Sequence, residues 1–159
     1  MKLEDVAIID SEVDWQECLQ HWVWLLEGCY EFSIYIVTKF AELLVVDNNG
    51  GIWFLSTSAA SFKQIAKDDS ELFIMLDIPE EADFIFMPQV IRLLEAEGMT
   101  LGKNECYGFI TPNVFAECEF NASNFRVTDI SKYLVGLGNM LGKLKDTKNG
   151  QKVEYKVIP

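Results

Sequence analysis

The residues with the greatest capacity for chemistry lie close together near the N-terminus. The stretch DWQECLQHWVWLLEGC, residues 14–29, contains the only histidine of the chain, His21, and two of its four cysteines, Cys18 and Cys29. A thiol and an imidazole three residues apart on a helix can touch, as a cysteine nucleophile and its base must. A zinc site would need three or four such ligands around one point. The stretch therefore raises two chemical hypotheses, a Cys–His dyad and a metal site.

Helical spacing favours packing over either kind of chemistry. We expect a helix that is capped by Asp10 or Ser11 and ends near Gly28. At about 100° per residue, His21 lies at the polar border of an apolar arc that contains Trp15, Cys18, Leu19, Trp22, Val23, Leu25, Leu26 and Cys29. A thiol in such an arc behaves as a small hydrophobe, and one histidine with two core cysteines on a single helix cannot enclose a metal. The sequence therefore predicts no catalytic residue, no metal site and no cofactor, and hence no enzyme.

Trp24 does not fit this packing pattern, because the helical wheel places it in the middle of the polar face, near Glu17 and Gln20. One interpretation is that the chain's own tail or a loop covers the indole. Another is that Trp24 anchors a partner protein, since Trp is enriched among binding hot spots. A drift of the helix could also bring it to a second internal face.

Acidic side chains form two further clusters, at residues 68–71 and 80–83. Paired carboxylates perform acid–base catalysis when a cleft holds them about 5–10 Å apart. Consecutive acids at a helix break or in a polar linker, as expected here, are more often solvated. The chain contains no P-loop, dinucleotide fingerprint, nucleophile elbow or H-E-x-x-H motif.

The pattern of the remaining residues predicts a single α+β domain over residues 1–159, with an antiparallel sheet and three or four helices. Strands follow one another before the helices instead of alternating with them, which favours α+β over βαβ units. Strands are expected at 31–38, 42–47 and 52–55, the last two joined as a hairpin by Asn48-Asn49-Gly50-Gly51. Further expected elements are a helix over 61–76 with a break at 68–69, a helix from Pro88 to Gly98, extended segments at 105–110 and 114–120, a helix over 129–144 capped by Thr128 or Asp129, and an edge strand at 151–158.

Charge and hydropathy limit the classes of partner. The net charge of −12 argues against nucleic acid, because binding a phosphate backbone requires clustered Lys and Arg. The same charge steers basic proteins toward the chain. No stretch reaches the roughly 20 apolar residues of a membrane-spanning helix, and the N-terminus lacks the pattern of a signal peptide. We therefore expect a cytoplasmic protein with reduced cysteines and no membrane partner.

Three segments together resemble a known family: DWQECLQHWVWLL, IVTKFAELLVVDNNGGIWFL and LGKNECYGFITPNVF. In order and spacing they are similar to the C-terminal domain of immunity proteins for type VI secretion DNase effectors, a domain that sometimes follows a GAD-like module. The resemblance runs from about Leu3 to Val157 and is closest at Glu105–Phe109. The chain departs from the family at Phe40-Ala41-Glu42, where a Phe-Gly-Asp-like word is usual, and at 112–117, where two glycines of the family's loop are missing.

The resemblance implies a binding protein that neutralises a co-encoded antibacterial toxin, such as a nuclease, by direct occlusion, and the altered loop implies a different toxin. We expect the partner to be a basic toxin domain, held by some or all of Glu17, Trp24, Asp68, Asp69, Glu105, Tyr107, Asn113, Phe115 and Glu117. A regulatory or structural interaction protein without a toxin partner is the alternative. An enzyme would require a deep cleft in which Glu105, Tyr107 and His21 converge.

Overall fold

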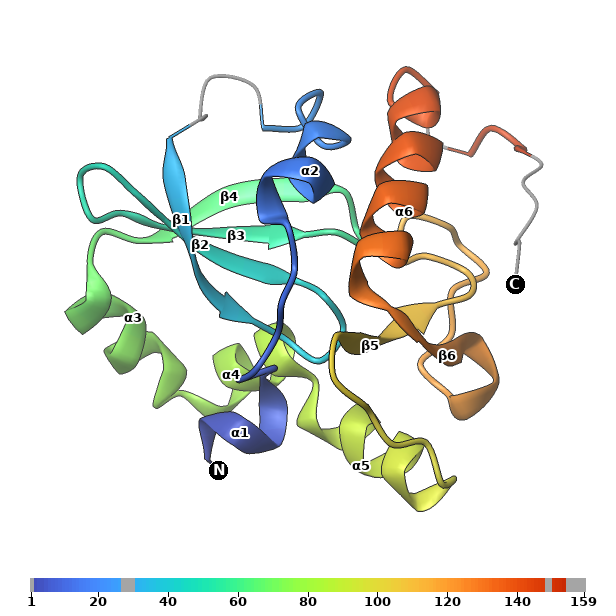
Figure 1. The fold of residues 1–159 in the computed structure, drawn as a ribbon, viewed down its shortest axis with the longest axis horizontal. Helices are drawn as coiled ribbons and strands as arrows, with labels where there is room; N and C mark the ends of the chain where they lie inside the picture. The colour runs from blue at the N-terminus through green and yellow to red at the C-terminus, as the bar shows by residue number, and fades with distance from the viewer. Residues whose placement is uncertain (1, 27–30, 148–149, 154–159) are drawn as a thin grey trace.

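Four antiparallel strands form the central sheet of the molecule (Figure 1). They are β1 (Phe32–Val37), β2 (Leu43–Asp47), β3 (Ile52–Ser56) and β4 (Ser61–Ala66), in sequential order. This computed structural model describes residues 2–26, 31–147 and 150–153. The hairpin between β2 and β3 is confirmed: Gly50 has a φ of 84°, and the Asp47 carboxylate accepts hydrogen bonds from the backbone N–H groups of Asn49 and Gly51. Asn-Gly and Gly-Gly pairs permit this backbone conformation.

Both faces of the central sheet are buried. Along β2, Leu43 and Val45 point to one core while Leu44 points to the other, as the two-residue period of a strand requires. The first core also receives side chains of α2 (Trp15–Gln20) and α6 (Ile130–Leu144). The second is closed by the helices α1 (Leu3–Val6), α3 (Asp69–Leu76), α4 (Pro79–Phe86) and α5 (Pro88–Ala96). The helices therefore lie in two groups on opposite sides of the sheet.

A second, two-stranded sheet contributes side chains to both cores. It consists of β5 (Glu105–Phe109) and β6 (Phe125–Asp129), preceded by the short 3-10 helix η1 (Ala122–Asn124). The N–H of Tyr107 donates to the carbonyl of Lys39, 2.8 Å away, which ties β5 to the turn between β1 and β2. Helix α6 follows β6 directly, and the Asp129 carboxylate caps it by accepting from the N–H of Lys132. The predicted α+β class is confirmed, as are the strand at 105–109 and the helices that begin at Pro88 and after Asp129.

Two predicted elements between residues 61 and 86 are wrong. Residues 61–66 form strand β4 instead of the first half of a helix, because they pair with β3 along its full length. Residues 79–86 form α4 instead of a polar linker. Pro79 occupies the first helical position, and Glu80 and Glu81 lie in the first turn, where carboxylates interact favourably with the helix dipole.

Three further predictions, at the N-terminal helix, at residues 114–120 and at residues 151–158, also need correction. The N-terminal helix spans only Trp15–Gln20, and its cap is Asp14 rather than Asp10 or Ser11. Residues 114–120 form turns and irregular backbone, and the strand that pairs with β5 is β6, which the sequence pattern did not reveal. Residues 151–153 form no strand, and the rest of the predicted edge strand lies outside the described residues.

Candidate functional site

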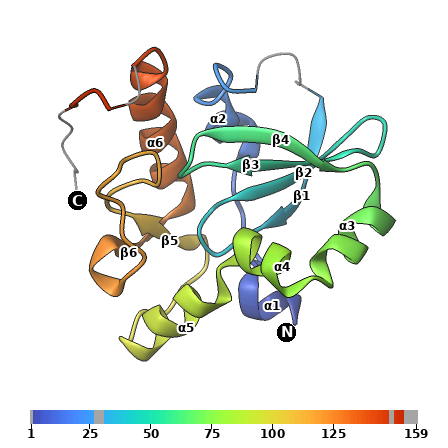
Figure 2. The same cartoon turned by 180° about the vertical axis from the view of Figure 1, so that it is seen from behind.

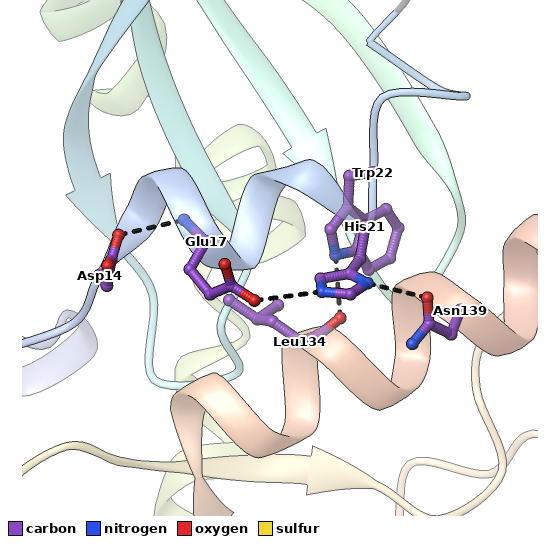
Figure 3. Close-up of polar contacts among 6 residues, drawn as sticks. All are labelled: Asp14, Glu17, His21, Trp22, Leu134 and Asn139. Atoms are coloured by element: carbon purple, nitrogen blue, oxygen red, sulfur yellow. Dashed lines mark hydrogen bonds and ion pairs between the residues drawn. The ribbon is translucent and has the colours of Figure 1, made fainter.

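His21, which follows the last residue of α2, and Cys18 within α2 have separate surroundings. The imidazole of His21 lies against α6 (Figure 3), where its Nδ1 is 2.9 Å from Oδ1 of Asn139, and its Nε2 is 3.6 Å from Oε1 of Glu17. Cys18 is 1% exposed, and burial raises the pKa of its thiol, which also has a hydrogen bond with Ser131. A buried thiol in its protonated form is a poor nucleophile. The geometry therefore assigns both residues to the α2–α6 contact, whereas Cys29 lies outside the described residues.

The two tryptophans after α2 are held by backbone carbonyls of α6. The fully buried Trp22 donates its indole N–H to the carbonyl of Leu134 at 3.0 Å (Figure 3). The indole N–H of Trp24 lies 3.0 Å from the carbonyl of His21 and 3.2 Å from that of Gly138. The two indoles stack with their centroids 5.8 Å apart. Trp24 is therefore partly buried against a helix of its own chain.

The helical wheel misplaced Val23 and Trp24, because residues 21–26 form turns after the helix ends at Gln20, whereas Trp22 and Leu26 of its apolar arc are buried as expected. Val23, expected in the apolar arc, is 50% exposed. Trp24, expected on a polar face, instead shares the α2–α6 contact.

Two glycines of α6 shape the surface that receives the indoles. A Cβ at Gly138 would lie 2.7 Å from the carbonyl oxygen of His21 and 2.8 Å from Nε1 of Trp22. A Cβ at Gly142 would lie 2.9 Å from Nε1 of Trp24. Residues four apart share one face of a helix, so the spacing of Gly138 and Gly142 in GLGNMLG was the available sequence signal for this contact.

A pocket of about 520 Å³ brings together two of the predicted interface residues, Glu105 and Tyr107. It lies between the N-terminal segment, the β1–β2 turn and the loop after α5, and it is lined by Ala7, Ile8, Lys39, Glu95, Thr100, Leu101, Gly102, Glu105 and Tyr107. His21 is not among the lining residues, so the structure does not assemble the three side chains that an enzyme was expected to need.

The polar groups of this pocket interact with neighbouring groups of the chain. The Tyr107 hydroxyl donates to the carbonyl of Met99 at 2.9 Å, and burial raises the pKa of this tyrosine. Oε2 of Glu105 accepts the N–H of Gly102 at 2.7 Å. Nζ of Lys39 lies 3.7 Å from Oε1 of Glu95. These contacts hold the loop after α5 against β5.

The remaining predicted interface residues are far apart. Asp68 and Asp69 are exposed at the start of α3, where Asp68 caps the helix, and Glu17 is exposed on α2. In the β5–β6 loop, Asn113 and Glu117 are exposed and Phe115 is partly buried. Figures 1 and 2 place α3 and this loop at opposite ends of the molecule. The nine predicted residues therefore do not form one surface.

A buried carboxyl, Glu42, was not identified from the sequence as a special residue. Glu42 is 2% exposed, and its Oε1 accepts the Ser58 hydroxyl at 2.6 Å, while Oε2 has no hydrogen-bond partner among the described residues. Burial raises the pKa of this carboxyl. The preceding residue, Ala41, has a φ of 58°, in the left-handed region that favours glycine. The turn from Thr38 to Glu42 is thus a strained backbone segment followed by a buried acid.

No group of three or more His, Cys, Asp or Glu side chains within the described ranges is arranged to hold a metal ion. None of the helices in the same ranges has both the length and the apolar character needed to cross a membrane. In comparisons with known proteins, no family model matches the chain and no curated protein is significantly similar to it.

Proposed function

We propose that this chain is a non-catalytic, cytoplasmic binding protein that neutralises a co-encoded antibacterial toxin by covering a basic surface of it. The observation that carries this proposal is the net charge of −12 on a chain whose most reactive side chains are used in packing. Cys18 and Tyr107 are buried, and His21 contacts Glu17 and Asn139.

Strong negative charge suits the task of a neutraliser. A toxin must be bound before it acts, and complementary charge raises association rates to about 10⁸–10⁹ M⁻¹s⁻¹ at low salt. Enzymes that act on nucleic acids present basic surfaces to their substrate, so a nuclease is a toxin class that an acidic protein can occlude. No catalytic group is needed for such a role.

The resemblance to immunity proteins of type VI secretion DNase effectors supports the same proposal. The family usually has glycine at the position of Ala41, and this residue has a φ of 58°. A positive φ is the conformation for which glycine is favoured, so the turn of this chain agrees with the family's pattern although the side chain differs.

A rescue assay tests the proposal. The basic toxin domain encoded beside the gene is expressed in bacteria with and without this chain, and binding of the purified proteins is measured with a catalytically inactive toxin. We expect growth to be restored and a dissociation constant near 1 nM, equivalent to about −12 kcal/mol. An unrelated protein of similar size and charge is the control and should not rescue. Absence of both rescue and binding would favour a regulatory or structural role without a toxin.

A further inference from the structure

Helices α3 and α4 concentrate the negative charge of the molecule. Between Lys67 and Arg92 the chain contains no basic residue and seven acidic ones: Asp68, Asp69, Glu71, Asp77, Glu80, Glu81 and Asp83. All seven are exposed. Figure 1 shows the two helices in succession along the chain, and they pack against one another.

The same two helices expose large apolar side chains. Phe73 and Ile74 on α3 are 55% and 69% exposed, Ile78 between the helices is 47% exposed, and Phe84 on α4 is 71% exposed. The other large exposed apolar residues are spread along the rest of the described chain: Leu3, Ile9, Val23, Tyr35, Leu93, Val114 and Phe120. Four large exposed apolar side chains within 12 residues are therefore more than the folding of a monomer requires.

The fold does not require these side chains to be apolar. On α3 the buried position is Leu72, and on α4 the buried positions are Ala82, Ile85 and Phe86. Phe84 lies three and four residues after Glu81 and Glu80, so it shares the solvent face of α4 with them. Its ring makes an edge-to-face contact with Phe54 of the second core, with centroids 6.1 Å apart.

We propose that this α3–α4 face, defined by Phe73, Ile74, Ile78 and Phe84 with the seven surrounding acids, docks a basic protein surface whose Lys and Arg residues surround an apolar centre. The proposal rests on the proposed function, since the occupant is the toxin domain itself. Apolar residues at the centre of an interface supply most of its affinity, and a charged rim governs the association rate and orientation. Arg and Lys also bind favourably over exposed Phe rings.

Charge determines which occupant fits this face. Nucleic acid and anionic lipid surfaces are repelled by seven carboxylates. A second copy of the chain would bring two such acidic sets together, which opposes self-association. A basic protein surface is the occupant that complements both the acids and the apolar side chains.

Two sets of substitutions test the face, each with a matched control. The apolar set is Phe84→Ala with Ile74→Ala, and its control is Ile9→Ala with Val23→Ala, which are exposed to a similar degree. The charge set is Glu80→Gln, Glu81→Gln and Asp83→Asn, and its control is Asp10→Asn, Glu97→Gln and Asp146→Asn, which removes the same charge from exposed residues elsewhere. Circular dichroism and thermal unfolding confirm that each variant is folded.

Binding to the neighbouring-gene toxin domain is the first measurement. We expect the apolar set to weaken binding at least about tenfold, and the charge set to lower the association rate at least about fivefold at low salt. Both controls should stay within about twofold of the unsubstituted chain. If this chain binds the toxin and both α3–α4 sets bind equally well, the face is not the docking surface, while the proposed function stands.

A defined probe separates the two proposals. The ¹⁵N-labelled chain is titrated with a synthetic amphipathic peptide of lysine and leucine, and with an all-glutamate-and-leucine peptide as its control. We expect amide shifts to change at residues 68–84 with the basic peptide only. Shifts elsewhere would overturn the docking surface. Amide shift changes at residues 68–84 in a chain that does not bind the toxin would support the docking surface and reject the toxin as its occupant.

Discussion

The α2–α6 contact and the α3–α4 face are both rich in aromatic and acidic residues, yet they differ in how these residues are used. In the α2–α6 contact, Trp22 and Trp24 donate their indole N–H groups to carbonyls of the same chain, and glycines of α6 admit their rings. On the α3–α4 face, Phe73 and Phe84 remain more than half exposed beside the exposed acids of residues 68–83. The number of aromatic residues in a segment therefore does not identify an interface. Their exposure in the folded chain is what indicates an interface.

The difference has a simple physical origin. The indole N–H must keep a hydrogen bond when it is buried, and a helix carbonyl beside a glycine supplies one without a steric clash. A Phe ring has no polar group that needs a hydrogen bond. Its exposure on the surface therefore costs only the free energy of hydrating an apolar group. The aromatic rings of the α2–α6 contact therefore stabilise the fold, whereas those of the α3–α4 face remain accessible to a partner.

The largest expected effect separates the two regions by stability. Trp22→Ala should lower the free energy of unfolding by about 3–5 kcal/mol, because it removes a fully buried ring and its hydrogen bond. Ile74→Ala should change it by less than about 0.5 kcal/mol, since Ile74 is 69% exposed. Urea unfolding followed by circular dichroism measures both. Similar losses for the two variants would mean that the Ile74 side chain packs into the folded core.

The next effect concerns the glycines that admit the indoles. Gly138→Ala should cost about 1–3 kcal/mol of stability, because the new Cβ meets the His21 carbonyl at 2.7 Å. Gly136→Ala is the matched control on the same helix, where a Cβ meets nothing within 4 Å. It should gain up to about 1 kcal/mol from helix propensity. Equal effects in the same unfolding experiment would contradict a close α2–α6 approach.

A third prediction concerns the buried acid Glu42. The pKa of Glu42 is raised in the folded chain, so its stabilising contribution is complete below the ordinary glutamate pKa and is lost as the pH rises through the raised value. Across that window, the stability of the unsubstituted chain should fall relative to Glu42→Gln by about 1.4 kcal/mol per pH unit.

Unfolding curves recorded at several pH values above pH 4 measure this difference. Gln89→Ala, an uncharged substitution at an exposed position of α5, is the control, and its stability should remain parallel to that of the unsubstituted chain. A parallel Glu42→Gln curve would show that the buried carboxyl carries no raised pKa.

The fold was predictable where local signals are strong. Asn48-Asn49-Gly50-Gly51 located the β2–β3 hairpin, and Pro88 and Asp129 located the starts of α5 and α6. Strand β4 was not predictable in this way, because SFKQIA has no clear two-residue alternation and becomes a strand by pairing with β3. Helix α4 did carry a signal, a proline followed by two acids, but the acids were interpreted as a linker.

The site was less predictable than the fold. A helical wheel is valid only where the backbone is helical, and α2 ends before Trp22, so the wheel positions of Val23 and Trp24 were both wrong. Of the interpretations left open for Trp24, its contact with α6 favours a second internal face. The acids of α3 and α4 were noticed in the sequence. The exposure of Phe84 could not be predicted, since a phenylalanine directly before the buried Ile85 and Phe86 has the sequence signature of a core position.

The smallest expected effect sharpens the comparison at Trp24. Trp24→Phe keeps an aromatic ring and removes the N–H that lies 3.0 Å from the His21 carbonyl and 3.2 Å from that of Gly138. We expect a loss of about 0.5–1.5 kcal/mol of stability with no change in toxin binding. Phe84→Ala should give the reverse, an unchanged stability and weaker binding, because its ring is 71% exposed. Denaturation and binding are measured on the same two protein preparations. If Trp24→Phe weakens binding and leaves stability unchanged, then Trp24 is an anchor for the partner, and the roles of the two regions are the opposite of those argued from their contacts.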